Sequence, residues 1–285
     1  MRLIGSKALI TGAAGGIGRA ISMELLAAGA EVLMVDRDSR ALALAASAAD
    51  FAGARLETFV ADLTSAPDRA RLCHAARAWH GGVNILINNA GLNPFGLYDE
   101  LTAGQLDAVL AVNLQAPLHL CRELLPHLRS QSAAAIVNMG SVFGAIGFPG
   151  YVAYSTTKFA LRGFTEALRR ELAGSGVVVK YLAPRATLTP INSSEVQKMN
   201  AELGVSMDPP ERVARELLAL LRSSRNSAVV GWPEKLFVRV NALLPSIVDR
   251  GIRKQRPIVE KFARAAATAA ASPMPDTLSL RKTAR

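Results

Sequence analysis

The stretch that decides the fold is TGAAGGIG, residues 11–18, which follows an apolar run and precedes a helix-like segment that ends near residue 28. A glycine-rich turn between a buried strand and a helix is typical of dinucleotide-binding folds. We expect Gly12 to permit the tight turn, Gly16 to let the backbone approach a pyrophosphate, and Gly18 to allow close packing of helix on sheet.

Short apolar runs alternate with helical stretches along the chain. The strand-like runs lie at 7–11, 31–36, 56–61, 83–88, 134–139, 177–182 and 227–230. This alternation is the signature of βαβ units, because parallel strands need long crossover connections. It predicts an α/β fold of the Rossmann type over residues 1–231: a doubly wound parallel sheet of about seven strands flanked by helices.

Composition agrees with that architecture. Half of the 285 residues are hydrophobic but only 5% are aromatic, which suits a parallel sheet covered by Ala-rich helices. Cys73 and Cys121 lack metal-ligand spacing, so we expect them to be core residues in a reducing compartment, and we expect no metal site. We also expect neither a signal peptide nor a spanning helix, and a cytoplasmic location that is at most peripheral to a membrane.

An acidic residue ends the second predicted strand. Asp36 lies 18 residues after Gly18, where a carboxylate accepts hydrogen bonds from an adenosine ribose and repels a 2′-phosphate. It therefore favours NAD over NADP, unless it only caps the following helix. Arg37 follows directly and could pair with such a phosphate, so NADP remains the alternative cofactor.

Tyr154 and Lys158 lie four residues apart in the run YSTTK, so that on a helix both face the same way. A ketone that accepts a hydride needs a proton, which a tyrosine with a pKa near ~10 can donate. We expect the Lys158 ammonium to lower the pKa of Tyr154 and to bind the nicotinamide ribose. Ser141, just past the fifth predicted strand, is placed to hydrogen-bond the substrate oxygen.

The order of these motifs resembles that of the short-chain dehydrogenase/reductase family, in its branch with TGxxxGxG, NNAG and a Ser…YxxxK site. The resemblance covers about residues 5–231. It implies an NAD(P)-dependent oxidoreductase with Ser141, Tyr154 and Lys158 as catalytic residues. It adds Asn113, which would hold a water that links the lysine to bulk solvent. It also implies a homodimer or homotetramer built on the helices that carry Asn113 and Tyr154.

The resemblance also assigns the cofactor contacts. One departure from the family lies after the sixth strand, where Arg185 replaces the usual glycine that follows Pro184. An arginine there could meet an anionic substrate group, a cofactor phosphate or only solvent. The predicted cofactor-binding residues are Gly12, Gly16, Ile17, Gly18, Asp36, Arg37, Asp62, Leu63, Asn89, Ala90, Gly91, Tyr154, Lys158, Pro184, Thr187 and Thr189.

Positive charge gathers at the C-terminal end. The net charge is +10 overall, and residues 225–285 hold twelve Lys/Arg against four Asp/Glu. We expect a basic amphipathic helical extension over 232–264, with a kink or a new helix at Pro245, and disorder over 265–285. The stretch 234–256 suits an anionic membrane surface, but its apolar face equally suits the body of the protein or a second subunit. Nucleic acid is not an expected partner.

Two functions remain open. The leading one is interconversion of a secondary alcohol and a ketone on a lipophilic substrate, either 3-oxoacyl-like or a hydroxylated lipid or steroid-like alcohol. Phe143, Ile146, Phe148 and Tyr151 are candidates for an apolar pocket wall, and 188–208 for a mobile lid. The alternative is a catalytically idle NAD(P)-binding regulatory protein, which the intact Ser, Tyr and Lys argue against.

Overall fold

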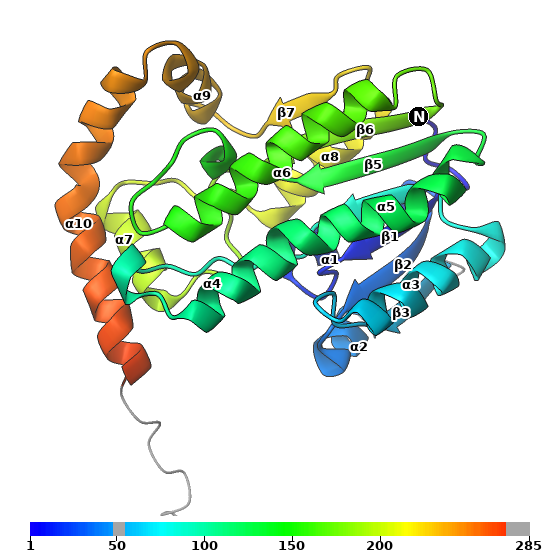
Figure 1. Ribbon diagram of the computed structural model, residues 1–285, viewed down its shortest axis with the longest axis horizontal. Coiled ribbons are helices and arrows are strands. Elements are labelled where there is room, and N and C mark those ends of the chain that lie inside the picture. Colours follow the sequence, from blue (N-terminus) through cyan, green and yellow to red (C-terminus); the bar gives the residue numbers. More distant parts are fainter. Residues whose placement is uncertain (48–54, 272–285) are drawn as a thin grey trace, which may run out of the picture.

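The computed structural model describes residues 1–47 and 55–271 (Figure 1). Within them a seven-stranded parallel sheet has the order β3-β2-β1-β4-β5-β6-β7. The strands are β1 (Lys7–Thr11), β2 (Glu31–Asp36), β3 (Leu56–Val60), β4 (Ile85–Asn88), β5 (Ala134–Met139), β6 (Val177–Ala183) and β7 (Ser227–Val229). The predicted doubly wound parallel sheet is therefore confirmed.

Helices cover both faces of the sheet (Figure 1). One face carries α1 (Gly16–Ala27), α2 (Ser39–Ser47) and α8 (Pro210–Arg222). The other carries α3 (Ala66–Ala78), α5 (Ala116–Arg129) and α6 (Val152–Glu171), with α4 (Ala103–Leu110) packed against α6. The short α7 (Ser194–Glu202) lies between β6 and α8 in the chain.

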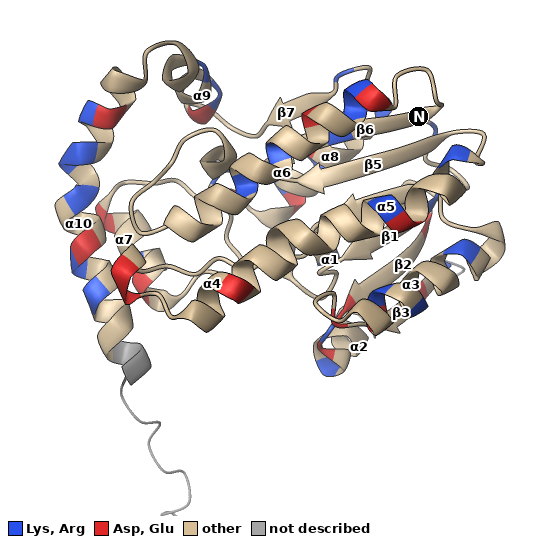
Figure 2. Ribbon diagram, viewed as in Figure 1, with Lys and Arg blue, Asp and Glu red and all other residues tan. Residues whose placement is uncertain are grey.

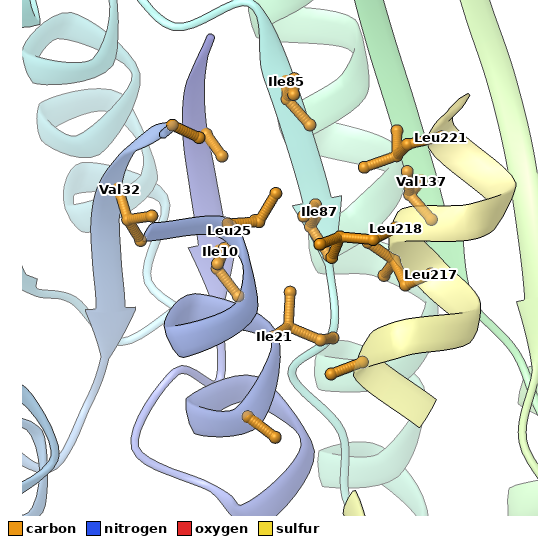
Figure 3. Close-up of a cluster of buried hydrophobic side chains, with 14 of the residues drawn as sticks. Ile10, Ile21, Leu25, Val32, Ile85, Ile87, Val137, Leu217, Leu218 and Leu221 are labelled. Carbon is orange, nitrogen blue, oxygen red and sulfur yellow. The ribbon is translucent and has the colours of Figure 1, made fainter. Parts of the chain in front are cut away.

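The core beneath α1 fixes the position of the glycine-rich turn. Side chains at every third or fourth position of α1, among them Ile21 and Leu25, pack beside α8 and onto the strands (Figure 3). Each large aliphatic side chain buried in this way stabilises the fold by about 1.5–3 kcal/mol. This packing holds the N-terminus of α1 over the carboxyl edge of β1. On the opposite face, Cys73 and Cys121 are buried in the second core, as expected.

The C-terminal extension consists of two helices, α9 (Glu234–Leu243) and α10 (Pro245–Ala271). Pro245 starts the second helix, one of the two outcomes predicted for it. Val259, Phe262 and Ala263 of α10 are buried, and α10 lies beside α7 (Figure 1). Among the described residues, none of the helices combines the length and the apolar character that a transmembrane span requires.

The helical extension continues past its predicted end. The run AAATAAA at 265–271 is helical, so the expectation of disorder from 265 onward is wrong for these residues. Alanine has the highest helix propensity, which lets α10 continue without a core to pack against. The rest of the predicted tail, 272–285, lies outside the described residues.

Candidate active site

The glycines of the turn after β1 stand where a side chain would not fit. Gly12 has a positive φ of 63°, and a Cβ there would lie 2.7 Å from the Cα of Ala90. A Cβ on Gly18 would overlap the Gly12 carbonyl oxygen, and one on Gly16 would lie 2.8 Å from Thr189 Cγ2. At these three positions of the turn, only glycine avoids a close contact with neighbouring atoms.

The N-terminus of α1 is chemically suited to an anion. Gly15 occupies the N-cap position, and among the described residues no side chain caps this helix end. The first turn of α1 contains no acidic residue. Unpaired backbone N–H groups and the helix dipole together favour a phosphate at such an end. The residues present therefore fit a dinucleotide pyrophosphate.

A hydrogen-bond network joins the NNAG turn to the glycine-rich turn. The side-chain amide of Asn89 donates to the carbonyls of Thr11 and Gly12, at 3.0 and 3.1 Å. The Thr11 hydroxyl oxygen accepts from the backbone N–H groups of Asn89 and Ala90. The two turns are thus fixed to each other, and together they form one side of a groove along the carboxyl edge of the sheet.

Asp36 is held inside that groove by backbone donors. Its carboxylate accepts from the N–H of Ala14 at 3.1 Å and of Arg37 at 2.8 Å. Asp38, and not Asp36, accepts from the N–H of Ala41 in the first turn of α2. The simple capping reading of Asp36 is therefore wrong.

The groove has a volume of about 370 Å³ and collects nearly all the residues predicted to contact the cofactor. Asp62 and Leu63 line it from the end of β3, and Pro184 and Thr189 from the loop after β6. Thr187 is the exception, because it lines the neighbouring cavity instead. Its hydroxyl donates to the Arg185 carbonyl.

Helix α6 places Tyr154 and Lys158 on one side of the groove. The Lys158 ammonium lies 5.5 Å from the Tyr154 ring centroid and donates to the Met139 carbonyl at 2.9 Å. Ser141, just beyond β5, accepts at its hydroxyl from the Phe143 N–H at 3.1 Å. The structure therefore brings together the three residues that the sequence had placed in one site.

The acidity of the phenol differs from what the sequence predicted. Burial raises the pKa of Tyr154 to about 12, and a hydrogen bond with Ser141 opposes this rise only in part. Burial also lowers the pKa of Lys158 to about 8, because the ammonium is removed from water. The pKa of Tyr154 is thus raised and not lowered as expected, and burial, not the nearby Lys158, determines its direction.

Asn113 lies in a single π-helical turn, Ala111–Gln115, between α4 and α5. Its side chain is fully buried and is engaged on both sides: it accepts from the Leu92 N–H at 2.7 Å and donates to the Leu92 carbonyl and to Thr157. Such π-turns occur often at functional sites. The water-holding role of Asn113 stays a prediction.

A second cavity, of about 610 Å³, adjoins the groove. Tyr154 lines both, as do Gly140 and Pro184. Stacked rings of Phe143 and Phe148, with centroids 5.1 Å apart, form part of its wall. Ile146 and Tyr151, the other two residues proposed for an apolar wall, also line it.

Sequence reasoning missed several of the cavity residues. Val196 and Met199 of α7 line the cavity and lie within 188–208, the segment predicted to be a mobile lid, whose mobility stays a prediction. The helices of the extension contribute Phe237, Val240 and Ile252, which the amphipathic pattern of that segment could have indicated. Other missed residues gave no local signal: Asn93 lines both hollows, and its buried side-chain oxygen has no hydrogen-bond partner among the described residues.

Known proteins are similar to this chain in sequence and in fold. The family model of the short chain dehydrogenases matches residues 6–200. The chain belongs to the short-chain dehydrogenase family. As a member of that family, it is an oxidoreductase that acts on CH–OH groups with NAD or NADP.

Several relatives are similar over most of this short-chain dehydrogenase. Nodulation protein G of Rhizobium sp. (strain N33) is 38% identical over 199 residues, which are 70% of this chain and 78% of that protein. The 3-oxoacyl-[acyl-carrier-protein] reductase FabG of Thermotoga maritima is 31% identical over 81% of this chain and 96% of its own. A solved short chain dehydrogenase/reductase of Burkholderia phymatum, in complex with NAD, has a TM-score of 0.78 at 26% identity and covers 85% of this chain and 94% of its own.

Proposed function

We propose that this dehydrogenase interconverts a lipophilic secondary alcohol and its ketone, with Tyr154 as the general acid and base. The observation that carries the proposal is the position of Tyr154 at the junction of two hollows: the groove that suits a dinucleotide and the apolar cavity beside it. A group that lines both can exchange a proton with a substrate whose reacting carbon faces the cofactor.

Each neighbour of Tyr154 would have a separate task. The bound nicotinamide supplies or accepts the hydride. Ser141 donates a hydrogen bond to the substrate oxygen as negative charge develops on it. Lys158 provides a positive charge beside the phenol, and Asn113 orders the helix turn next to Lys158 and holds the water through which protons exchange with solvent.

Replacing Tyr154 by Phe tests the proposal, with Tyr151→Phe as a matched control in the same cavity. Loss of a positioned acid or base slows turnover by about 10²–10⁴-fold, while the affinity for NADH should stay within about twofold. Among the described residues no lysine affects the pKa of Tyr151, so its variant should keep most of the activity. Unchanged turnover in Tyr154→Phe would reject the role. If the wild type bound NADH but turned over none of a panel of ketones, the idle regulatory alternative would stand.

The cavity supports a lipophilic substrate. Aromatic and aliphatic side chains dominate its lining, and its volume is within the range of pockets that take drug-sized molecules. A 3-oxoacyl-like chain or a hydroxylated lipid or steroid-like alcohol would suit such a cavity, and the Thermotoga relative is named as a 3-oxoacyl reductase.

We further propose NAD as the preferred cofactor. Asp36 places a carboxylate in the groove, where it would accept hydrogen bonds from ribose hydroxyls and repel a 2′-phosphate. Arg37 lines the same groove, where it would pair with a 2′-phosphate and so favour NADP. The similar Burkholderia structure is a complex with NAD.

A homodimer or homotetramer through α6 and the neighbouring α5 is also proposed. On α6, Val152 and Phe159 are about half exposed, beside a shallow hollow lined by Phe148 and Pro149. Apolar side chains that gather at one surface point often mark a contact with another chain. Sedimentation of the wild type and of Phe159→Glu checks this proposal, since only the wild type should form the larger species.

We propose, finally, that the tip of the extension docks on an anionic membrane. Leu236, Leu243, Leu244 and Ile247 are exposed there, Leu243 at 80%. Lysines and arginines recur along α10 next to this tip (Figure 2). An exposed apolar patch with a basic flank suits the interface of a bilayer that contains anionic lipids. The patch adjoins the cavity, which Ile247 also lines.

Vesicle co-sedimentation tests membrane docking. Leu243→Ser/Leu244→Ser should reduce binding to vesicles that contain phosphatidylserine, while Leu44→Ser, an equally exposed leucine on α2, should not. Point variants are preferable to removal of the extension, because α9 and α10 also line the cavity. Equal binding by all three proteins would reject the proposal.

A further inference from the structure

One wall of the substrate cavity is built by the C-terminal extension. Phe237 and Val240 of α9 and Val248 and Ile252 of α10 line the same cavity as Ser141 and Tyr154 of the body. The residues of this wall lie beyond the segment 6–200 that the family model matches. The family model therefore gives no information on the wall that meets the far part of a substrate.

Helix α9 packs against α10 but has few contacts with the rest of the protein. None of its residues is buried, so apolar packing fixes it only weakly. Among the described residues, two of its polar side chains contact the body. Near its end, the Asn241 side chain donates to the Ala145 carbonyl at 2.8 Å. At its start, Glu234 contacts Arg185, the residue that departs from the family pattern.

The Arg185 guanidinium links three segments that are far apart in the sequence. It forms a paired contact with the Asp208 carboxylate, through Nε at 2.9 Å and Nη2 at 2.7 Å. Its Nη1 donates to the Trp232 carbonyl at 3.1 Å and lies 3.3 Å from the Glu234 carboxylate. Arg185 thereby connects the loop after β6 to the start of α8 and to the start of α9.

Because of these contacts with Asp208 and Glu234, Arg185 is poorly suited to bind an anion. Two carboxylates face its single positive charge, and its side chain is only 10% exposed. The Asp208 carboxylate holds the pKa of Arg185 above its usual value, and Arg185 in turn holds the pKa of Asp208 below its own. Arg212 also pairs with Asp208, at 2.9 Å. None of the three roles considered from the sequence, a substrate anion, a cofactor phosphate or solvent, matches these contacts.

We infer that Arg185 is a positioning residue that pins α9 over the cavity and so sets the preference for long apolar substrates. The inference rests on the proposed function and adds a determinant of specificity to it. A short ketone fills only the part of the cavity near Tyr154 and does not need the α9 wall. A long one gains binding energy from Phe237 and Val240 only while α9 stays in place.

Two variants disrupt the contact between Arg185 and α9 in different ways. Arg185→Met removes the whole link, whereas Glu234→Gln weakens only the arm that reaches α9 and leaves the contact with Asp208 intact. Arg212→Met is the matched control, because it removes the other arginine on Asp208 without touching α9. Arg185→Lys should give an intermediate result, since a lysine can reach one carboxylate but cannot form the paired contact.

Steady-state kinetics with 2-butanone and 2-decanone provide the first readout. For Arg185→Met and Glu234→Gln, the KM for 2-decanone should rise by about tenfold while both kinetic constants for 2-butanone stay within about twofold. Arg212→Met should leave the ratio of the two ketones unchanged. Equal effects on both ketones would overturn the inference.

Hydrogen exchange of the full-length protein provides a second readout that does not depend on turnover. In Arg185→Met and Glu234→Gln, the amides of 234–243 should exchange at least about fivefold faster, while those of α1 remain unchanged. Wild-type exchange rates in α9 would show that Arg185 does not hold this helix. If the wild type reduced neither ketone, the proposed function would fail, and the exchange data would still decide whether Arg185 holds α9.

Discussion

Replacing Lys158 by Met should abolish activity and yet stabilise the protein. Lys158 is almost completely buried, and burial lowers its pKa from the usual 10.5 to about 8. At neutral pH this makes the charged form about 3 kcal/mol less favourable than in water. Met has a similar length and no charge, so it avoids that cost. It loses the hydrogen bond to the Met139 carbonyl, which is worth about 1–2 kcal/mol.

The net expectation is a free energy of unfolding about 1–2 kcal/mol higher for Lys158→Met at pH 7. The sign follows from proton binding: between about pH 8 and pH 10.5 the unfolded chain binds more protons at this lysine than the folded protein does. The wild type therefore gains stability as the pH rises through that interval. The advantage of the variant is full below pH 8 and declines above it.

Urea unfolding of both proteins at about pH 7 and about pH 9.5 measures this difference. Lys180→Met is an informative control, because Lys180 is also buried but donates to two carbonyls, those of Ser223 and Arg225. That variant should be destabilised. A Lys158→Met protein that is less stable than the wild type at both pH values, by the same amount, would refute the reasoning that the buried charge is costly.

Three further predictions concern the groove and the phenol. Oxidation of an alcohol needs ionised Tyr154, whose pKa is about 12. The kcat/KM for oxidation should therefore rise from about pH 6 to about pH 8, while the kcat/KM for reduction stays constant. A constant kcat/KM for oxidation over this range would contradict the role of Tyr154. Asp36→Ala should weaken NADH binding by about tenfold and strengthen NADPH binding, measured by fluorescence titration, and an unchanged ratio would argue against its role. Gly16→Val should raise the Kd for NADH by more than about tenfold with the fold retained, because even its Cβ would lie 2.8 Å from Thr189.

Strands and motifs could be predicted because their signals are local. Strand β5 is buried at all six positions, and its sequence is an apolar run that only Asn138 interrupts. The glycines of the turn after β1 are required by backbone contacts that any chain of this fold must make. The spacing of Tyr154 and Lys158 places them together on any helix.

The features that could not be predicted depend on contacts between segments that are distant in the sequence. The partners of Arg185 lie 23 and 49 residues away, and no local pattern points to either. The pKa of Tyr154 could not be predicted from its neighbour Lys158, because its direction is set by burial, which depends on the packing of distant segments. The amphipathic pattern of 234–256 indicated an apolar face but not what that face covers. In the structure, some side chains of that face line the cavity and others are exposed to solvent.

The two hollows of the site share residues from the first 191 positions, but only the cavity also uses the C-terminal extension. The groove is lined by residues no later than Ile191, whereas the cavity draws on residues as late as Gln255. The last part of the chain therefore contributes to the substrate cavity alone. A graft that exchanges only the last fifty or so residues for those of another family member could therefore redirect the enzyme to new compounds, while the machinery that handles the dinucleotide remains untouched.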